Sequence, residues 1–112
     1  MITTHVLDTS LGMPAANVAV ALEWIDAYGE SSLLGESRTD ADGRARDLLT
    51  ASHILKAGRY RLSFDTGGYF TTTRRETFYP MVAITFDVRD ATQHYHVPLL
   101  VSPYGYSTYR GS

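Results

Sequence analysis

The stretch HYHVPLLVSPYGYSTYRGS, residues 94–112, concentrates side chains that could do chemistry. It holds two histidines, four tyrosines and one arginine beside an apolar run. Domain ends are usually polar and frayed. A neutral imidazole can take a proton from water near neutral pH, because its ordinary pKa is about 6.5. The stretch therefore indicates a surface on which something binds or reacts.

The histidines have competing interpretations. On a strand, the spacing of His94 and His96 puts both side chains on one face. Metal sites also use this spacing, but no Asp, Glu or Cys nearby completes a ligand set. We therefore expect no metal, and a metal-binding module built from His5, His94 and His96 remains an alternative. From local sequence alone, His5 is more often an exposed polar residue, and His53 is expected in an exposed loop.

Arg44 follows the turn pair Asp42-Gly43, in which glycine supplies the positive φ of a tight turn. From the local sequence alone, Arg44 is interpreted simply as the first residue after a hairpin turn. The DADG stretch, residues 40–43, lacks the ligand spacing and closing glutamate of a calcium loop, so we reject that interpretation.

Composition narrows the class of protein. The 112 residues are 44% hydrophobic and 20% charged with a net charge of -2, which predicts a single globular domain over residues 1–112. This charge favours neither nucleic acid nor an anionic membrane as partner. The absence of cysteine excludes disulfides and thiolate zinc sites. No signal peptide or spanning segment is visible, so the cytoplasm is the expected compartment.

Apolar residues recur with period two, which is typical of strands that face a core on one side. The clearest segments are 18–25, 59–65 and 82–88, separated by glycine and proline turns. This pattern predicts an antiparallel β-sandwich. One short helix is expected within residues 68–76.

The same rule assigns faces at the two ends of the chain. His5 points away from the face that carries Val6. In residues 94–101 the core face is Tyr95, Val97, Leu99 and Val101, which leaves His94, His96 and Pro98 on the outer face. Pro98 cannot donate to a ladder, so we predict an edge strand or a bulge there. An outer face with imidazoles, and with Tyr109 and Gly111 following, indicates a surface on which another molecule docks.

Three stretches together resemble the transthyretin-like family, specifically its 5-hydroxyisourate hydrolase branch. They are THVLDTSLGMPAANVAVAL (residues 4–22), TDADGR (39–44) and the tail at 94–112, which ends in YRGS. The resemblance covers nearly the whole chain in colinear order, with departures in segments 26–37 and 50–58. It implies an all-β sandwich of two four-stranded antiparallel sheets with one short helix. It also implies a homotetramer with sites at the dimer-dimer interface.

The resemblance further implies the site residues and the reaction. His5, Arg44, His96 and Ser112 would be catalytic, and His5, Arg44 and Tyr109 would bind substrate. The implied reaction is the hydrolytic opening of the cyclic amide of 5-hydroxyisourate to 2-oxo-4-hydroxy-4-carboxy-5-ureidoimidazoline in urate degradation, without a cofactor. The face assignment agrees independently for His5, His96 and Tyr109, whereas Arg44 and Ser112 rest on the resemblance.

Chemistry gives each group a task. One of His5 and His96 activates water, and the other orients it or protonates the leaving nitrogen; which does which stays open. The fixed charge of Arg44 should lower the histidine pKa and stabilise the developing oxyanion. Ser112 offers a hydroxyl and, as the last residue, a carboxylate. A non-catalytic small-ligand carrier of the transthyretin kind is the alternative function.

Overall fold

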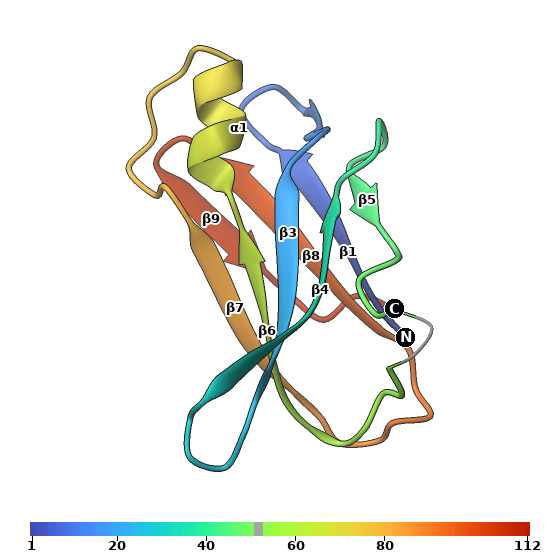
Figure 1. Cartoon of the computed structure of the whole chain (residues 1–112). Helices are drawn as coiled ribbons and strands as arrows, with labels where there is room; N and C mark the ends of the chain where they lie inside the picture. Colours follow the sequence, from blue (N-terminus) through green and yellow to red (C-terminus); the bar gives the residue numbers. More distant parts are fainter. Residues whose placement is uncertain (51–52) are drawn as a thin grey trace.

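A computed structural model describes residues 1–50 and 53–112, and within them the chain forms two facing sheets and one helix (Figure 1). The first sheet has the order β2 (Met13–Pro14), β1 (Ile2–Asp8), β8 (Tyr95–Ser102) and β9 (Gly105–Thr108), with β5 (Arg44–Ala45) also paired to β1. The second has the order β4 (Ser31–Arg38), β3 (Ala19–Ile25), β6 (Gly58–Phe64) and β7 (Val82–Val88). The helix α1 (Thr66–Thr72) follows β6. The predicted all-β sandwich with one short helix is confirmed. The first sheet has five strands where four were expected, because the short β5 pairs with β1, and the helix begins before the expected residues 68–76.

The core lies between the sheets and follows the period-two pattern. On β6, Tyr60, Leu62 and Phe64 are at most 1% exposed. Opposite them, Val97 and Leu99 of β8 point inward from the other sheet and are also buried. Each such side chain contributes about 1.5 to 3 kcal/mol on burial. The predicted inner face of residues 94–101 is confirmed, so His94 and His96 do point outward.

One strand pair departs from the antiparallel expectation. β1 and β8 run parallel, with Thr3 opposite His96 and His5 opposite Pro98. The prediction that Pro98 marks an edge or a bulge was wrong, because β8 lies between β1 and β9. Proline is accommodated there since the β8–β9 ladder stops at Leu99 and returns only as a single bridge between His96 and Gly111. The missing N–H of Pro98 falls in this gap.

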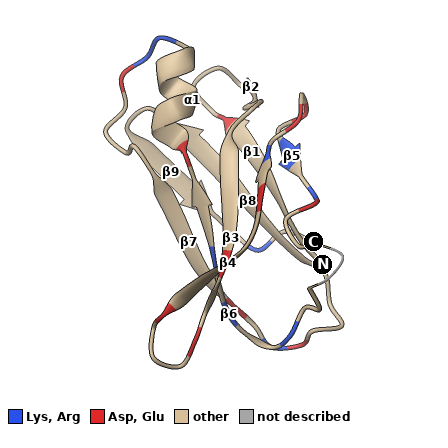
Figure 2. Ribbon diagram, in the orientation of Figure 1, with Lys and Arg blue, Asp and Glu red and all other residues tan. Residues whose placement is uncertain are grey.

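Charged residues are spread over separate segments (Figure 2). The short β5 is basic through Arg44, whereas acidic residues are found in turns and at strand ends of both sheets. Within residues 1–50 and 53–112, no helix is long and apolar enough to cross a membrane.

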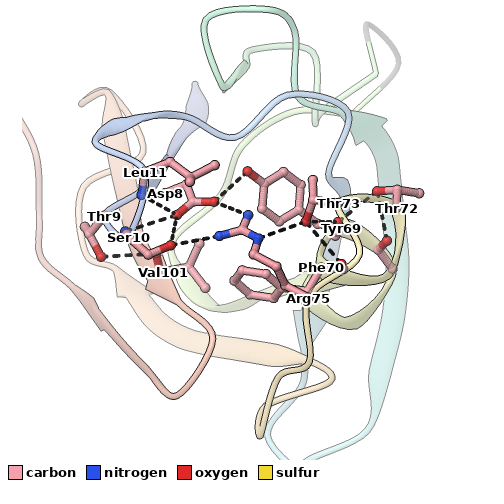
Figure 3. A network of polar contacts seen from close by, with 11 residues as sticks. Asp8, Thr9, Ser10, Leu11, Tyr69, Phe70, Thr72, Thr73, Arg75 and Val101 are labelled. Carbon is pink, nitrogen blue, oxygen red and sulfur yellow. Dashed lines mark hydrogen bonds and ion pairs between the residues drawn. The ribbon is translucent and has the colours of Figure 1, made fainter.

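A buried carboxylate holds α1 against the end of β1 (Figure 3). Asp8 is 0% exposed and accepts hydrogen bonds from Arg75 at 2.6 Å, the Tyr69 hydroxyl at 2.7 Å and the Ser10 hydroxyl at 2.6 Å. Burial alone would raise its pKa, but these hydrogen bonds and one from the Leu11 N–H outweigh that effect and lower the pKa to about 2. Burial and the bond to Asp8 raise the pKa of Tyr69 to about 12.

We expect Asp8→Asn to lower the free energy of unfolding by about 3 to 5 kcal/mol, because it leaves Arg75 without a carboxylate partner. The folded pKa of about 2 lies below the ordinary 3.8. The ionised carboxylate therefore stabilises the fold at pH values above its ordinary pKa. This stabilisation is lost as the pH falls through the pKa of the folded state. Urea unfolding at fixed protein concentration from pH 7 to pH 2 measures both effects.

Asp87→Asn is the matched control, because it breaks the exposed ion pair between Arg59 and Asp87. Its effect should stay within about 1 kcal/mol. Equal losses in the two variants would contradict a special role of the Asp8 network.

Candidate active site

Strand pairing gathers the predicted site residues on the outer face of the first sheet. β1 lies between β5 and β8. His5 is opposite Arg44 on one side and Pro98 on the other, while Thr3 is opposite His96. Residues directly opposite each other in paired strands share a face. His5, Arg44 and His96 therefore project from the same side of the sheet.

The turn before β5 fixes Arg44. Oδ1 of Asp40 accepts hydrogen bonds from the backbone N–H of Asp42 at 2.8 Å and of Arg44 at 3.0 Å. Gly43 has φ +78° and has no room for a side chain, since a Cβ there would collide with the Val6 carbonyl. Only glycine suits such a position. The turn thus delivers Arg44 to β1 in one register.

Three of the predicted catalytic residues, Arg44, His96 and Ser112, line one depression of about 250 Å³. The other lining residues are Met1, Thr3, Thr4, Arg46 and His94. Both ends of the chain lie at this end of the sheet (Figure 1). The depression is small and carries two arginines, whose planar donors suit a planar substrate rich in carbonyl oxygens.

His5 and Tyr109 lie outside this depression. Tyr109 lines a neighbouring one with His96 and Arg110, and it is 58% exposed. His96 therefore lies between the two hollows. The structure brings Arg44, His96 and Ser112 together directly, and places His5 beside Arg44 and Tyr109 beside His96.

The hydrogen bond of His5 identifies its free nitrogen. Nε2 lies 2.8 Å from the carbonyl oxygen of Asp42. A carbonyl only accepts, so Nε2 carries a proton and Nδ1 of a neutral ring keeps its lone pair. His5 is partly exposed, and Nδ1 is the nitrogen with which it can accept a proton or orient water.

His96 is kept neutral by its surroundings. Burial lowers its pKa, and the charge of Arg44 lowers it further, with smaller contributions from His94 and His5. Its Nδ1 lies 2.8 Å from the Thr3 hydroxyl, which leaves Nε2 for other partners. At neutral pH His96 is thus an uncharged imidazole able to accept a proton.

Sequence reasoning did not single out Thr3 on this face, and it placed Gly111 there without its contact with His96. Thr3 contacts both His94 and His96, and its parity with His5 was the available signal. Gly111 passes over the His96 ring, so a Cβ there would lie 2.6 Å from Cδ2 and 3.3 Å from Cγ. The side-chain spacing in the sequence gives no sign of this close approach.

We expect Gly111→Ala to lower kcat about 10-fold to 100-fold, because the added methyl displaces the His96 ring and small misplacements of reacting groups slow the reaction strongly. The matched control is Gly105→Ala, where the nearest atom to a Cβ is 3.7 Å away. Steady-state rates of both variants give the comparison. Wild-type kcat in Gly111→Ala would contradict this packing.

The donor groups do not assemble a metal site. Among the described residues, no three His, Asp or Glu side chains lie close enough to hold an ion. The alternative of a metal module built from His5, His94 and His96 gains no support from this geometry. His53 is exposed, as predicted, with Nδ1 2.6 Å from the Thr50 hydroxyl.

Comparisons with known proteins agree on one family. The sequence model described as "Transthyretin: HIUase/Transthyretin family" matches residues 2–111. A 5-hydroxyisourate hydrolase of Caulobacter vibrioides is 50% identical over 115 residues, covering 99% of this chain and 97% of that protein. The solved 5-hydroxyisourate hydrolase of Klebsiella pneumoniae superposes with a TM-score of 0.82 at 40% identity, covering 99% and 98% of the two chains. Sea bream transthyretin in complex with thyroxine gives 0.90 at 32% identity, covering 98% and 93%.

Proposed function

The chain belongs to the HIUase/transthyretin family, and from this premise we propose that it is a 5-hydroxyisourate hydrolase. The hydrolase relatives match along nearly their whole length and support the prediction from sequence. The observation that carries the proposal is the depression in which Arg44, His96 and Ser112 meet, with His96 held neutral beside a fixed positive charge.

The reaction adds water to the cyclic amide carbonyl and breaks the ring C–N bond. Water is a poor nucleophile, so a base must remove its proton during attack. His96 is the proposed base, because its Nε2 is free and its pKa is lowered. Arg44 then stabilises the negative charge on the carbonyl oxygen with its planar donors. His5 orients the water through Nδ1, and no cofactor is required.

Tyr109 and Ser112 are proposed to hold the substrate. Both are exposed in the isolated chain, and the depression is open to solvent on one side unless a second surface covers it. Small-molecule sites bury about 70% or more of their ligand. We propose a homotetramer in which two dimers meet over this face and complete the site. The tetrameric state and the interface position are drawn from the family and fit this exposure.

A carrier of the transthyretin kind is the second candidate, because the same fold binds thyroxine in the sea bream protein. Polar groups argue against it here. Binding of an apolar ligand does not require a neutral imidazole beside an arginine. Burying these polar groups under such a ligand without partners would weaken its binding.

The deciding experiment follows the ultraviolet decay of freshly generated 5-hydroxyisourate with and without the purified protein. A hydrolase accelerates the decay in proportion to protein concentration and with saturation in substrate. A rate equal to the uncatalysed decay at micromolar protein would reject the hydrolase and favour the carrier.

A further inference from the structure

Thr3 joins two histidines on the outer face of the first sheet. Its Oγ1 lies 2.8 Å from Nε2 of His94 and 2.8 Å from Nδ1 of His96. These partners are 91 and 93 residues away in sequence, and the parallel pairing of β1 with β8 brings them together. Thr3 is only 5% exposed, so its hydroxyl is largely shielded from water.

One hydroxyl proton must serve two ring nitrogens. Thr3 can donate to only one of them, so at least one histidine carries a proton on the nitrogen that faces Thr3. If Thr3 donates to His94, neutral His96 has its proton on Nδ1 and presents Nε2 as a base. If Thr3 donates to His96, neutral His96 has its proton on Nε2 and is an acid. The two arrangements correspond to the two halves of an amide hydrolysis.

We propose that Thr3 and His94 form a proton relay that switches His96 from base to acid within one turnover. The proposal rests on the hydrolase function argued above. In the first half, the water oxygen forms its bond to the carbonyl carbon while Nε2 of His96 takes the water proton. The Nδ1 proton of His96 passes to Oγ1 of Thr3, and the hydroxyl proton of Thr3 passes to Nε2 of His94.

The second half returns every proton. The ring C–N bond breaks with its electron pair on nitrogen, and that nitrogen takes the proton from Nε2 of His96. Nε2 of His94 gives its proton back to Thr3, and Thr3 gives its own to Nδ1 of His96. The enzyme is restored and one water has been added across the amide.

The charges around His96 explain why a relay is useful. Arg44 from β5, His5 from β1 and His94, which directly precedes β8, all act on its ring electrostatically, and Arg46 lines the same depression. A positive charge that stayed on partly buried His96 would be repelled by Arg44. His94 is exposed, so water stabilises the charge there. Thr3 and His94 act through His96 and are positioning residues.

The test compares Thr3→Val, which removes the hydroxyl at constant shape, with Thr3→Ser, which keeps it. We expect Thr3→Val to lower kcat at least about 10-fold, part of the usual general-base effect, with KM nearly unchanged. Thr3→Ser should recover kcat to within about 3-fold of the wild type, because the proton path is retained. Thr66→Val is the matched control. Thr66, in α1, is another buried threonine, and its hydroxyl donates a hydrogen bond to the Tyr79 carbonyl.

Rates in mixtures of light and heavy water separate a relay from simple support of the ring. With several protons in flight, the wild-type kcat should depend on the deuterium fraction along a curve. The dependence should become linear in Thr3→Val and in His94→Gln, where one proton moves. His94 is exposed, so His94→Gln provides a folded variant if Thr3→Val is unstable.

Several results would overturn the relay while leaving the hydrolase intact. They are wild-type kcat with a curved dependence in Thr3→Val or His94→Gln, or a Thr3→Ser variant as slow as Thr3→Val. Failure of the hydrolase itself is distinguished by the wild type, which would then not accelerate 5-hydroxyisourate decay at all.

Discussion

Replacing His96 by asparagine is expected to lower kcat for 5-hydroxyisourate hydrolysis about 100-fold to 10,000-fold, the usual range for general-base catalysis. Asparagine is polar and similar in size, but it cannot accept a proton near neutral pH. His96 is only partly buried on an outer face, so the fold should survive the change. The ultraviolet assay measures the rate, and circular dichroism with a size measurement verifies the folded assembly.

His53→Asn is the matched control, because His53 is an exposed histidine bonded to the Thr50 hydroxyl and lines no part of the site. It should retain the wild-type rate. If His96→Asn also turned over normally while folded, His96 would not be the base, and the Nδ1 of His5 would become the leading candidate.

Arg44→Ala should lower kcat about 100-fold to 1,000-fold, because a donor to the developing oxyanion is lost. It should also change the pH dependence. The Arg44 charge lowers the pKa of His96, so its removal raises that pKa and a larger fraction of His96 is protonated at a given pH. Because the base must be neutral, activity falls on the acid side. The acid limb of kcat/KM is therefore expected to move to higher pH in the variant.

Arg59→Ala removes an arginine from the other sheet, where it pairs with Asp87 on the surface. Rate and acid limb should both stay in place. An Arg44→Ala variant whose rate falls while the acid limb does not move would show that Arg44 contacts the substrate without tuning His96. An unchanged rate would remove Arg44 from the site.

Alternation in the sequence was sufficient to predict which faces the strands present. The period-two rule depends only on the local backbone, so it assigned Tyr95, Val97 and Leu99 to the core and His96 to the outside, as the structure has them. The edge or bulge predicted from the missing N–H of Pro98 was wrong, because the place of a strand within its sheet depends on partners far along the chain. The parallel pairing of β1 with β8 leaves no local signal.

The site shows the same division. His5 and His96 could be singled out by face, whereas Arg44 needed the family resemblance, since only the pairing of β5 with β1 puts it opposite His5. The contacts of Thr3 with His94 and His96 depend on register and side-chain direction together. The roles of His5, Arg44, His96, Tyr109 and Ser112 remain predictions that the variants above can test.

A crystal structure of the assembled protein with a non-hydrolysable planar purine analogue tests the central claim most directly. We expect the analogue to lie against Arg44, with its reacting carbonyl within reach of water held by Nε2 of His96, and a second subunit to close over Tyr109 and Ser112. An analogue bound away from Arg44 and His96, or a site completed by one chain alone, would contradict it.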